Sequence, residues 1–144
     1  MRVVRTDVIE APVEATFDTA ADPQLQLQWD GDTLLDVHEL TPGPLAKGSR
    51  YRGRFKGMGT VEYEYAEFDR PHRLTHRTRV PFGVMNHELS FEPTEGGTRL
   101  TQVAWLEPNL IGRLASPLVR QVLRRRLPTV ARELRAFLAQ SPPA

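Results

Sequence analysis

Cysteine is absent from this chain of 144 residues, and that absence excludes disulfide bonds, thiolate metal ligands and a cysteine nucleophile. The sequence also lacks any run close to the about 18 consecutive apolar residues that a membrane-spanning helix needs. No charge of one sign dominates, because 19 basic and 18 acidic side chains leave a net charge of +1. The overall charge therefore favours neither nucleic acid nor an acidic membrane as a partner.

The N-terminal residues carry charges where a secretory signal peptide needs an apolar run. Internal repeats and low-complexity segments are missing too, apart from the short tail 141–144, which we expect to be frayed. A chain of this length suits one domain that buries roughly two thirds of its unfolded surface. We therefore expect a single cytoplasmic domain over residues 1–140, a monomer or homodimer with no stable membrane insertion.

What the sequence does contain is a strand-rich middle between helical segments. A first strand is expected from Arg2 to Glu10, and Pro12 and Pro23 each mark the start of a short helix, since proline is tolerated in a first helical turn. Alternating residues between glycine and proline turns then predict six further strands. These strands cover residues 33–40, 49–56, 60–68, 73–80, 84–92 and 98–106.

The chain ends in a predicted long amphipathic helix from about Asn109 to Ala139. Pro117 favours a helix start, with 109–115 as a preceding turn or short helix. Apolar residues then recur every three to five positions, which predicts one buried stripe. The stripe consists of Leu118, Val122, Leu123, Leu127, Val130, Leu134 and Leu138. Only the strand region is long enough to cover it, so a curved antiparallel sheet should grip the helix and leave room for a ligand.

Four short segments carry a resemblance to a known superfamily: 9–17 at the first strand-to-helix joint, 29–30 after the second short helix, and 67–74 and 96–101, each entering a strand. In this order they resemble the helix-grip superfamily (SRPBCC, START-like), which includes lipid-transfer domains, plant allergens, and bacterial polyketide cyclases, dehydrases and lipid-transport proteins. The resemblance implies an α+β helix-grip fold, with about seven antiparallel strands curved around a long C-terminal helix and two short helices between strands 1 and 2. It also implies a hydrophobic or amphipathic small ligand in an internal cavity, without naming that ligand.

Two histidines form the most specific candidate site that strand alternation predicts. His76 should face inward and, across a tight hairpin, lie opposite His87. Two inward imidazoles could orient a ligand through hydrogen bonds, or act as acid and base near neutral pH. They could also be satisfied core residues, bonded to Tyr63, Gln102 or a water. No third ligand joins the pair, since Glu88 alternates outward, so neither a metal nor another cofactor is predicted.

Other inward positions complete the expected lining of the cavity. The three tyrosines suit an aromatic ligand and plain packing equally well, whereas packing is favoured for the tryptophan. The last strand offers two faces, and we favour the one with Leu100 and Gln102 inward, because Leu100 would then pair with Phe91. The expected contact residues are Trp29, Tyr51, Tyr63, Tyr65, His76, Thr78, His87, Leu89, Gln102, Leu118 and Val122.

Charged residues are expected to point outward. The run Arg124-Arg125-Arg126 predicts a solvated helix face, and without interleaved aromatic residues it does not favour nucleic-acid binding. The arginines of the strands alternate outward opposite Glu62, Glu64 and Glu88, which predicts cross-strand charge pairs on the wet face of the sheet.

Three functions fit these observations. The first is binding or transport of a lipid, a polyketide-like compound or an aromatic metabolite. The second is a cyclase or dehydratase activity without metal or organic cofactor, with the cavity histidines and tyrosines as acid and base. The third is a regulatory interaction protein with a vestigial cavity. Binding is favoured, because the sequence contains no nucleophile elbow, phosphate loop or pair of inward carboxylates.

Overall fold

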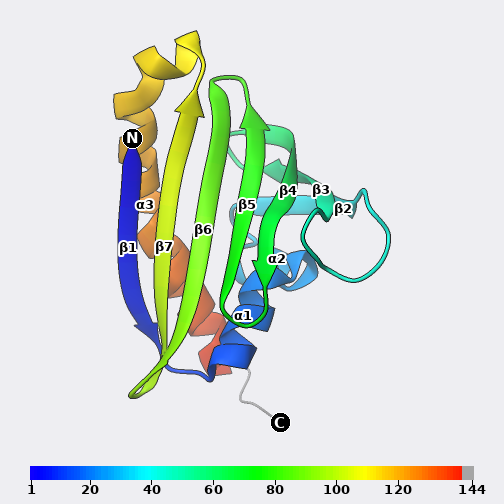
Figure 1. Ribbon diagram of the computed structural model, residues 1–144, viewed down its shortest axis with the longest axis vertical. Coiled ribbons are helices and arrows are strands. Elements are labelled where there is room, and N and C mark those ends of the chain that lie inside the picture. The colour runs from blue at the N-terminus through cyan, green and yellow to red at the C-terminus, as the bar shows by residue number, and fades with distance from the viewer. Residues whose placement is uncertain (141–144) are drawn as a thin grey trace.

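The computed structural model describes residues 1–140, in which seven antiparallel strands form one curved sheet and three helices lie against it (Figure 1). The elements are β1 (Arg2–Ile9), α1 (Val13–Ala21), α2 (Pro23–Trp29), β2 (Leu34–Glu39), β3 (Arg50–Phe55), β4 (Gly59–Asp69), β5 (Arg73–Val80), β6 (Gly83–Thr94), β7 (Gly97–Pro108) and α3 (Leu110–Gln140). The strands follow the order β1-β7-β6-β5-β4-β3-β2. The predicted α+β helix-grip fold is confirmed; the tail 141–144 lies outside the described residues.

The two short helices begin at the predicted prolines. Pro12 precedes α1, and the Asp22 carboxylate caps α2 by accepting a hydrogen bond from the backbone N–H of Gln24 at 2.9 Å, with Pro23 in the first turn. Phe17 of α1 meets Phe68 and Phe91 edge to face, with ring centroids 5.4 and 5.2 Å apart. These contacts fix the helix pair against one end of the sheet.

The strand register agrees with the predicted alternation of faces. His76 lies opposite His87, Tyr51 lies opposite Tyr63, and Phe91 lies opposite Leu100. Leu100 and Gln102 of β7 are fully buried under α3, and Trp105 consequently points to the other face. The favoured inward face of the last strand is therefore confirmed.

The long helix begins at Leu110, next to the predicted Asn109, but it continues through Pro117, where we favoured a helix start. Asn109 caps it: the side-chain oxygen accepts the backbone N–H of Gly112 at 2.9 Å, and the side-chain amide donates to the Pro81 carbonyl at 2.9 Å. A Cβ atom on Gly112 would come within 2.0 Å of the Phe82 carbonyl oxygen. This close approach joins the helix start to the β5–β6 hairpin, so Pro117 was the wrong boundary.

The predicted buried stripe of α3 is wrong at its start. Leu118 and Val122, which were expected to contact a ligand, are 65% and 57% exposed on the side away from the sheet. A step of five residues rotates the side chain by about 140° around a helix, so Leu118 cannot share a face with Leu123. The buried residues of α3 are Gly112, Leu123, Leu127, Val130, Ala131 and Leu134.

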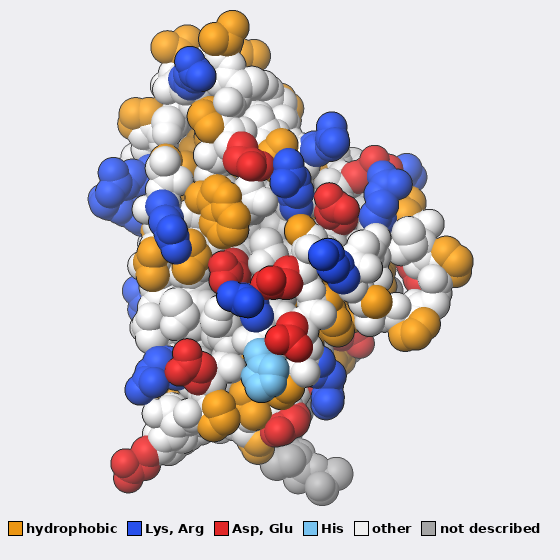
Figure 2. All heavy atoms as spheres, viewed as in Figure 1, with side chains coloured by type: hydrophobic (Ala, Val, Ile, Leu, Met, Phe, Trp, Pro, Cys, Tyr) orange, Lys and Arg blue, Asp and Glu red, His pale blue; other side chains and the backbone are white. Residues whose placement is uncertain are grey.

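The outer face of the sheet carries mixed charges, as predicted (Figure 2). Glu62 lies 3.3 Å from Arg52 and 3.5 Å from Arg50 across the strands, and Arg73 lies 2.7 Å from Glu67. All of these side chains are about half exposed, so each pair contributes roughly 0–1 kcal/mol. These charges keep the outer face of the sheet solvated. A binding site is therefore expected on the inner face.

Candidate functional site

A partly buried patch lies on the inner face of β5 and β6. In Figure 1, α3 passes behind β1 and β7, its main sheet partners, and leaves this part of the inner face less covered. The residues share the inward parity of the buried Leu74 and Leu89, yet keep accessible surface. We call them the inner-face patch: His76, Thr78, Val80, Met85 and His87.

A chain of hydrogen bonds fixes His87. The side-chain amide nitrogen of Gln102 donates to the Leu127 carbonyl of α3 at 2.9 Å, so its oxygen must face His87. His87 Nε2 lies 2.9 Å from that oxygen and is therefore the protonated, donating nitrogen of the ring. Because Gln102 is fully buried, its role is to orient the ring of His87.

His76 has no such support. Its ring meets Tyr65 and Tyr63 edge to face, with centroids 4.7 and 5.6 Å apart. Within residues 1–140, His76 Nε2 and the Tyr63 hydroxyl are buried without a hydrogen-bond partner. The Tyr65 hydroxyl, by contrast, donates to the Ala21 carbonyl at 2.6 Å. The structure therefore leaves two polar atoms of neighbouring aromatic side chains without partners near the patch.

Both histidines are neutral at physiological pH. Although each side chain keeps some accessible surface, its ring lies deep enough that burial lowers the pKa of His76 to about 3, helped by repulsion from His87. Burial also lowers the pKa of His87 to about 4, and the Gln102 hydrogen bond offsets part of that change. Burial raises the pKa of Tyr63, so its hydroxyl stays protonated. The site presents uncharged donors and acceptors.

The other residues that we expected to contact a ligand lie outside the inner-face patch. Tyr51 stacks on Tyr63 with centroids 5.9 Å apart, at the side of the patch. Trp29 is buried, and its indole N–H donates to the Thr19 carbonyl at 3.0 Å, which places it in the core. Leu89 is buried beside the patch. Leu118 and Val122 lie on the outer side of α3, away from all of them.

An ion pair beneath α3 was not predicted. Arg126 donates to both carboxylate oxygens of Asp30, one of them at 2.9 Å, and Asp30 is only 2% exposed. Arg126 thus departs from the predicted solvated run, while Arg124 and Arg125 are exposed. Three successive residues span about 200° around a helix, so they cannot all point to solvent when one side of the helix packs on the core. This spacing could have indicated that one arginine of the run approaches the core.

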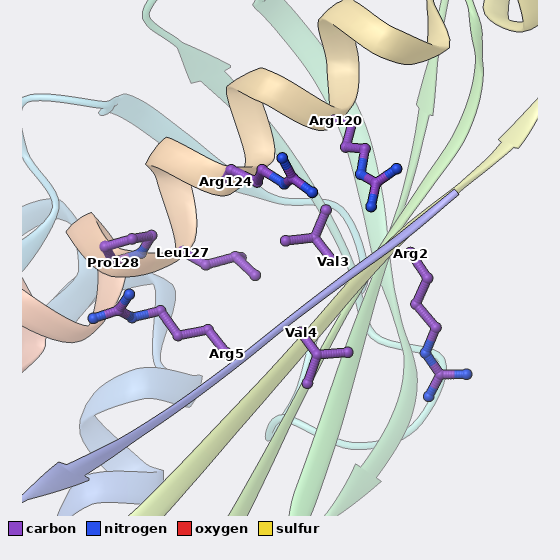
Figure 3. A pocket seen from close by; sticks show the side chains of 8 residues that line it. All are labelled: Arg2, Val3, Val4, Arg5, Arg120, Arg124, Leu127 and Pro128. Atoms are coloured by element: carbon purple, nitrogen blue, oxygen red, sulfur yellow. The ribbon is translucent and has the colours of Figure 1, made fainter.

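A hollow lies between β1 and α3, away from the inner-face patch. It is a solvent-open groove of about 430 Å³, and Figure 3 shows Arg120 and Arg124 reaching from α3 toward β1. Its lining consists of Arg2, Val3, Val4, Arg5, Arg120, Arg124, Leu127 and Pro128. Leu127 lines this groove, and its backbone carbonyl accepts the Gln102 amide that orients His87. Among residues 1–140, no three histidine, aspartate or glutamate side chains gather as a metal site.

The sequence from residue 1 to residue 138 matches the family described as polyketide cyclase / dehydrase and lipid transport. This chain belongs to that family. Membership agrees with the helix-grip architecture and with the resemblance of the four joint segments. The family description names cyclase or dehydrase activity and lipid transport for the family as a whole, and it does not identify the ligand of this member.

Solved structures share the fold of this family member at low sequence identity. The protein MLL2253 from Mesorhizobium loti is 17% identical with a TM-score of 0.75, and the match covers 99% of this chain and 100% of that chain. The protein TTHA0849 from Thermus thermophilus is 20% identical with a TM-score of 0.75 over the same shares, 99% and 100%. No curated protein matches the sequence. These likenesses establish the fold alone.

Proposed function

We propose that this family member binds a small hydrophobic or amphipathic ligand against the inner-face patch, between the sheet and α3. The observation that carries the proposal is the pair of buried polar atoms without partners, Tyr63 Oη and His76 Nε2. Leaving such an atom unsatisfied costs about 1–3 kcal/mol. A ligand oxygen that bonds either atom would remove that cost.

The surroundings indicate the chemistry of the ligand. Met85 and Val80 offer apolar surface, and the stacked, buried rings of Tyr51 and Tyr63 border the patch. The two imidazoles are neutral, and no charged side chain belongs to the patch. We therefore infer a mostly apolar lipid, polyketide-like or aromatic compound with an uncharged carbonyl or hydroxyl group.

Binding accounts for the site better than acid–base catalysis. A catalytic acid or base works best with a pKa near the working pH. Burial holds the pKa of His76 near 3 and that of His87 near 4, so at pH 7 neither ring carries the second proton that an imidazolium would donate, and both are weak bases. Their hydrogen-bonding capacity is unaffected, which suits ligand orientation.

Native mass spectrometry before and after organic extraction tests the proposal. We expect a retained small-molecule mass that extraction removes, and enhanced fluorescence of the neutral probe Nile red with the extracted protein. Tyr63→Phe and His76→Phe should each weaken probe binding about tenfold, because each removes a hydrogen bond of about 1–1.5 kcal/mol. Tyr65→Phe is the matched control, since that hydroxyl already has a protein partner. Absence of both the retained mass and the probe signal would contradict the proposal.

A further inference from the structure

Five large apolar side chains stand exposed on the first half of α3. We call them the apolar ridge: Leu110, Ile111, Leu114, Leu118 and Val122. Each is between 57% and 87% exposed, and four of them follow one another in steps of four residues. Such a row lies along one side of a helix, here the side away from the core. Single exposed apolar residues are ordinary, but a continuous row marks an interaction surface.

The fold holds this ridge in place. Asn109 caps the helix start and bonds the Pro81 carbonyl, and Gly112 lies directly on the Phe82 carbonyl. In Figure 1 the start of α3 forms one end of the molecule, and in Figure 2 hydrophobic side chains gather at that same end. The apolar row therefore sits on an anchored, convex tip.

The charge beside the ridge has one sign. Between Glu107 and Glu133 the sequence contains arginines and no acidic residue. Arg113, Arg120 and Arg124 lie about 80–120° around the helix from Leu114, on the flank that faces β1. Two of them line the groove together with Arg2. Within residues 1–140, no carboxylate lies within ion-pair distance of Arg2, Arg120 or Arg124.

We propose that this tip of α3 docks on the surface of an anionic lipid bilayer. The apolar ridge would enter the boundary between headgroups and acyl chains, and the arginines of the groove would face lipid phosphates. A second copy of the chain fits less well, because it would place arginine against arginine. A nucleic acid would contact the arginines but would leave the apolar ridge exposed to water. The net charge of +1 does not reveal this basic surface, because acidic residues elsewhere in the chain offset the arginines of α3.

The docking surface is independent of the ligand site. The apolar ridge faces away from the sheet, whereas the inner-face patch lies on the inner face of β5 and β6, so loss of either activity leaves the other testable. None of the helices in residues 1–140 is long and apolar enough to cross a bilayer. The proposed contact is accordingly peripheral, with the helix lying on the surface.

Vesicle flotation with the full chain tests the proposal. We expect binding to vesicles of equal parts phosphatidylglycerol and phosphatidylcholine, little binding to phosphatidylcholine alone, and a decrease as salt is added. Arg120→Gln with Arg124→Gln should lower the partition coefficient about 30-fold. Leu114→Ser with Leu118→Ser should lower it at least about tenfold.

Matched controls come from the outer face of the sheet. Arg52→Gln with Arg54→Gln removes two exposed charges on β3, and Leu35→Ser changes a leucine that is 42% exposed. Both should stay within about threefold of the unaltered protein. All changes are at exposed positions, so unchanged thermal unfolding is expected throughout. The proposal is overturned by absent binding to anionic vesicles at low salt, by equal losses in the controls, or by a dimer in solution that the ridge variant dissolves.

Discussion

At the scale of single residues, the two inward tyrosines of β4 have opposite environments. The Tyr65 hydroxyl donates to the Ala21 carbonyl at 2.6 Å, and the Tyr63 hydroxyl has no partner among residues 1–140. Tyr65→Phe should lower the free energy of unfolding by about 1–3 kcal/mol, because it strands a buried carbonyl. Tyr63→Phe should instead raise the free energy of unfolding of extracted protein by up to about 1–3 kcal/mol, because it removes a buried hydroxyl that has no partner. Urea unfolding measures both, and equal losses would show that Tyr63 has a protein partner.

The buried histidines predict how stability depends on pH. Both have a folded-state pKa below the ordinary 6.5, at about 3 for His76 and about 4 for His87. Between pH 6.5 and 4 the unfolded chain therefore binds more protons than the folded one, and stability falls as the pH falls. At about pH 5 each histidine should cost up to about 2 kcal/mol relative to about pH 7.

His76→Phe isolates that dependence from the titration of carboxylates. The variant should lose less stability than the unaltered protein between about pH 7 and about pH 5, while both lose similar amounts below about pH 3. His38→Phe is the control, because His38 is exposed on β2. Parallel pH profiles for the His76→Phe variant and the unaltered protein would show that His76 is not buried in its neutral form.

At the scale of elements, the Arg126–Asp30 pair connects α3 to the end of α2. Arg126→Met would leave the carboxylate of Asp30 buried without its cation, and should cost about 3–5 kcal/mol of unfolding free energy. Arg125→Met, one position earlier and exposed, should change stability by less than about 0.5 kcal/mol. Adding Asp30→Asn to the Arg126→Met variant should restore part of the loss. Chemical denaturation of the four proteins checks this, and equal costs at positions 125 and 126 would contradict it.

Strands and helices also differ in how far their sequence patterns determine the site. Side chains alternate across a strand with a period of two, so a correctly placed hairpin turn determines which residues face each other. The opposition of His76 and His87 could therefore be predicted from the alternation and the turn. A helix has about 3.6 residues per turn, and an apolar pattern with steps of five placed Leu118 on the wrong side. The Asn109 cap and the Arg126–Asp30 pair depend on tertiary contacts, which no local pattern contains.

At the scale of the whole molecule, the proposed ligand should stabilise the fold. A ligand at a hundredfold excess over its Kd adds about 2.7 kcal/mol to the free energy of unfolding. For a chain of this size, extraction should then lower the melting temperature by roughly 5–10 °C. Differential scanning calorimetry before and after extraction measures the change. The Tyr63→Phe variant should show a smaller difference, and identical melting temperatures in every case would argue against an occupied site.

The pairing of β1 with β7 has a consequence for how the chain folds. Ile9 lies opposite Thr98 and Arg2 lies opposite Trp105, so β1 finds its neighbour only after β7 has been made. Contacts between such distant segments give a high contact order, which slows folding. Until β7 and α3 arrive, the exposed β1 strand and the apolar inner face of the sheet are open to other chains. Aggregation should therefore compete with folding mostly during synthesis.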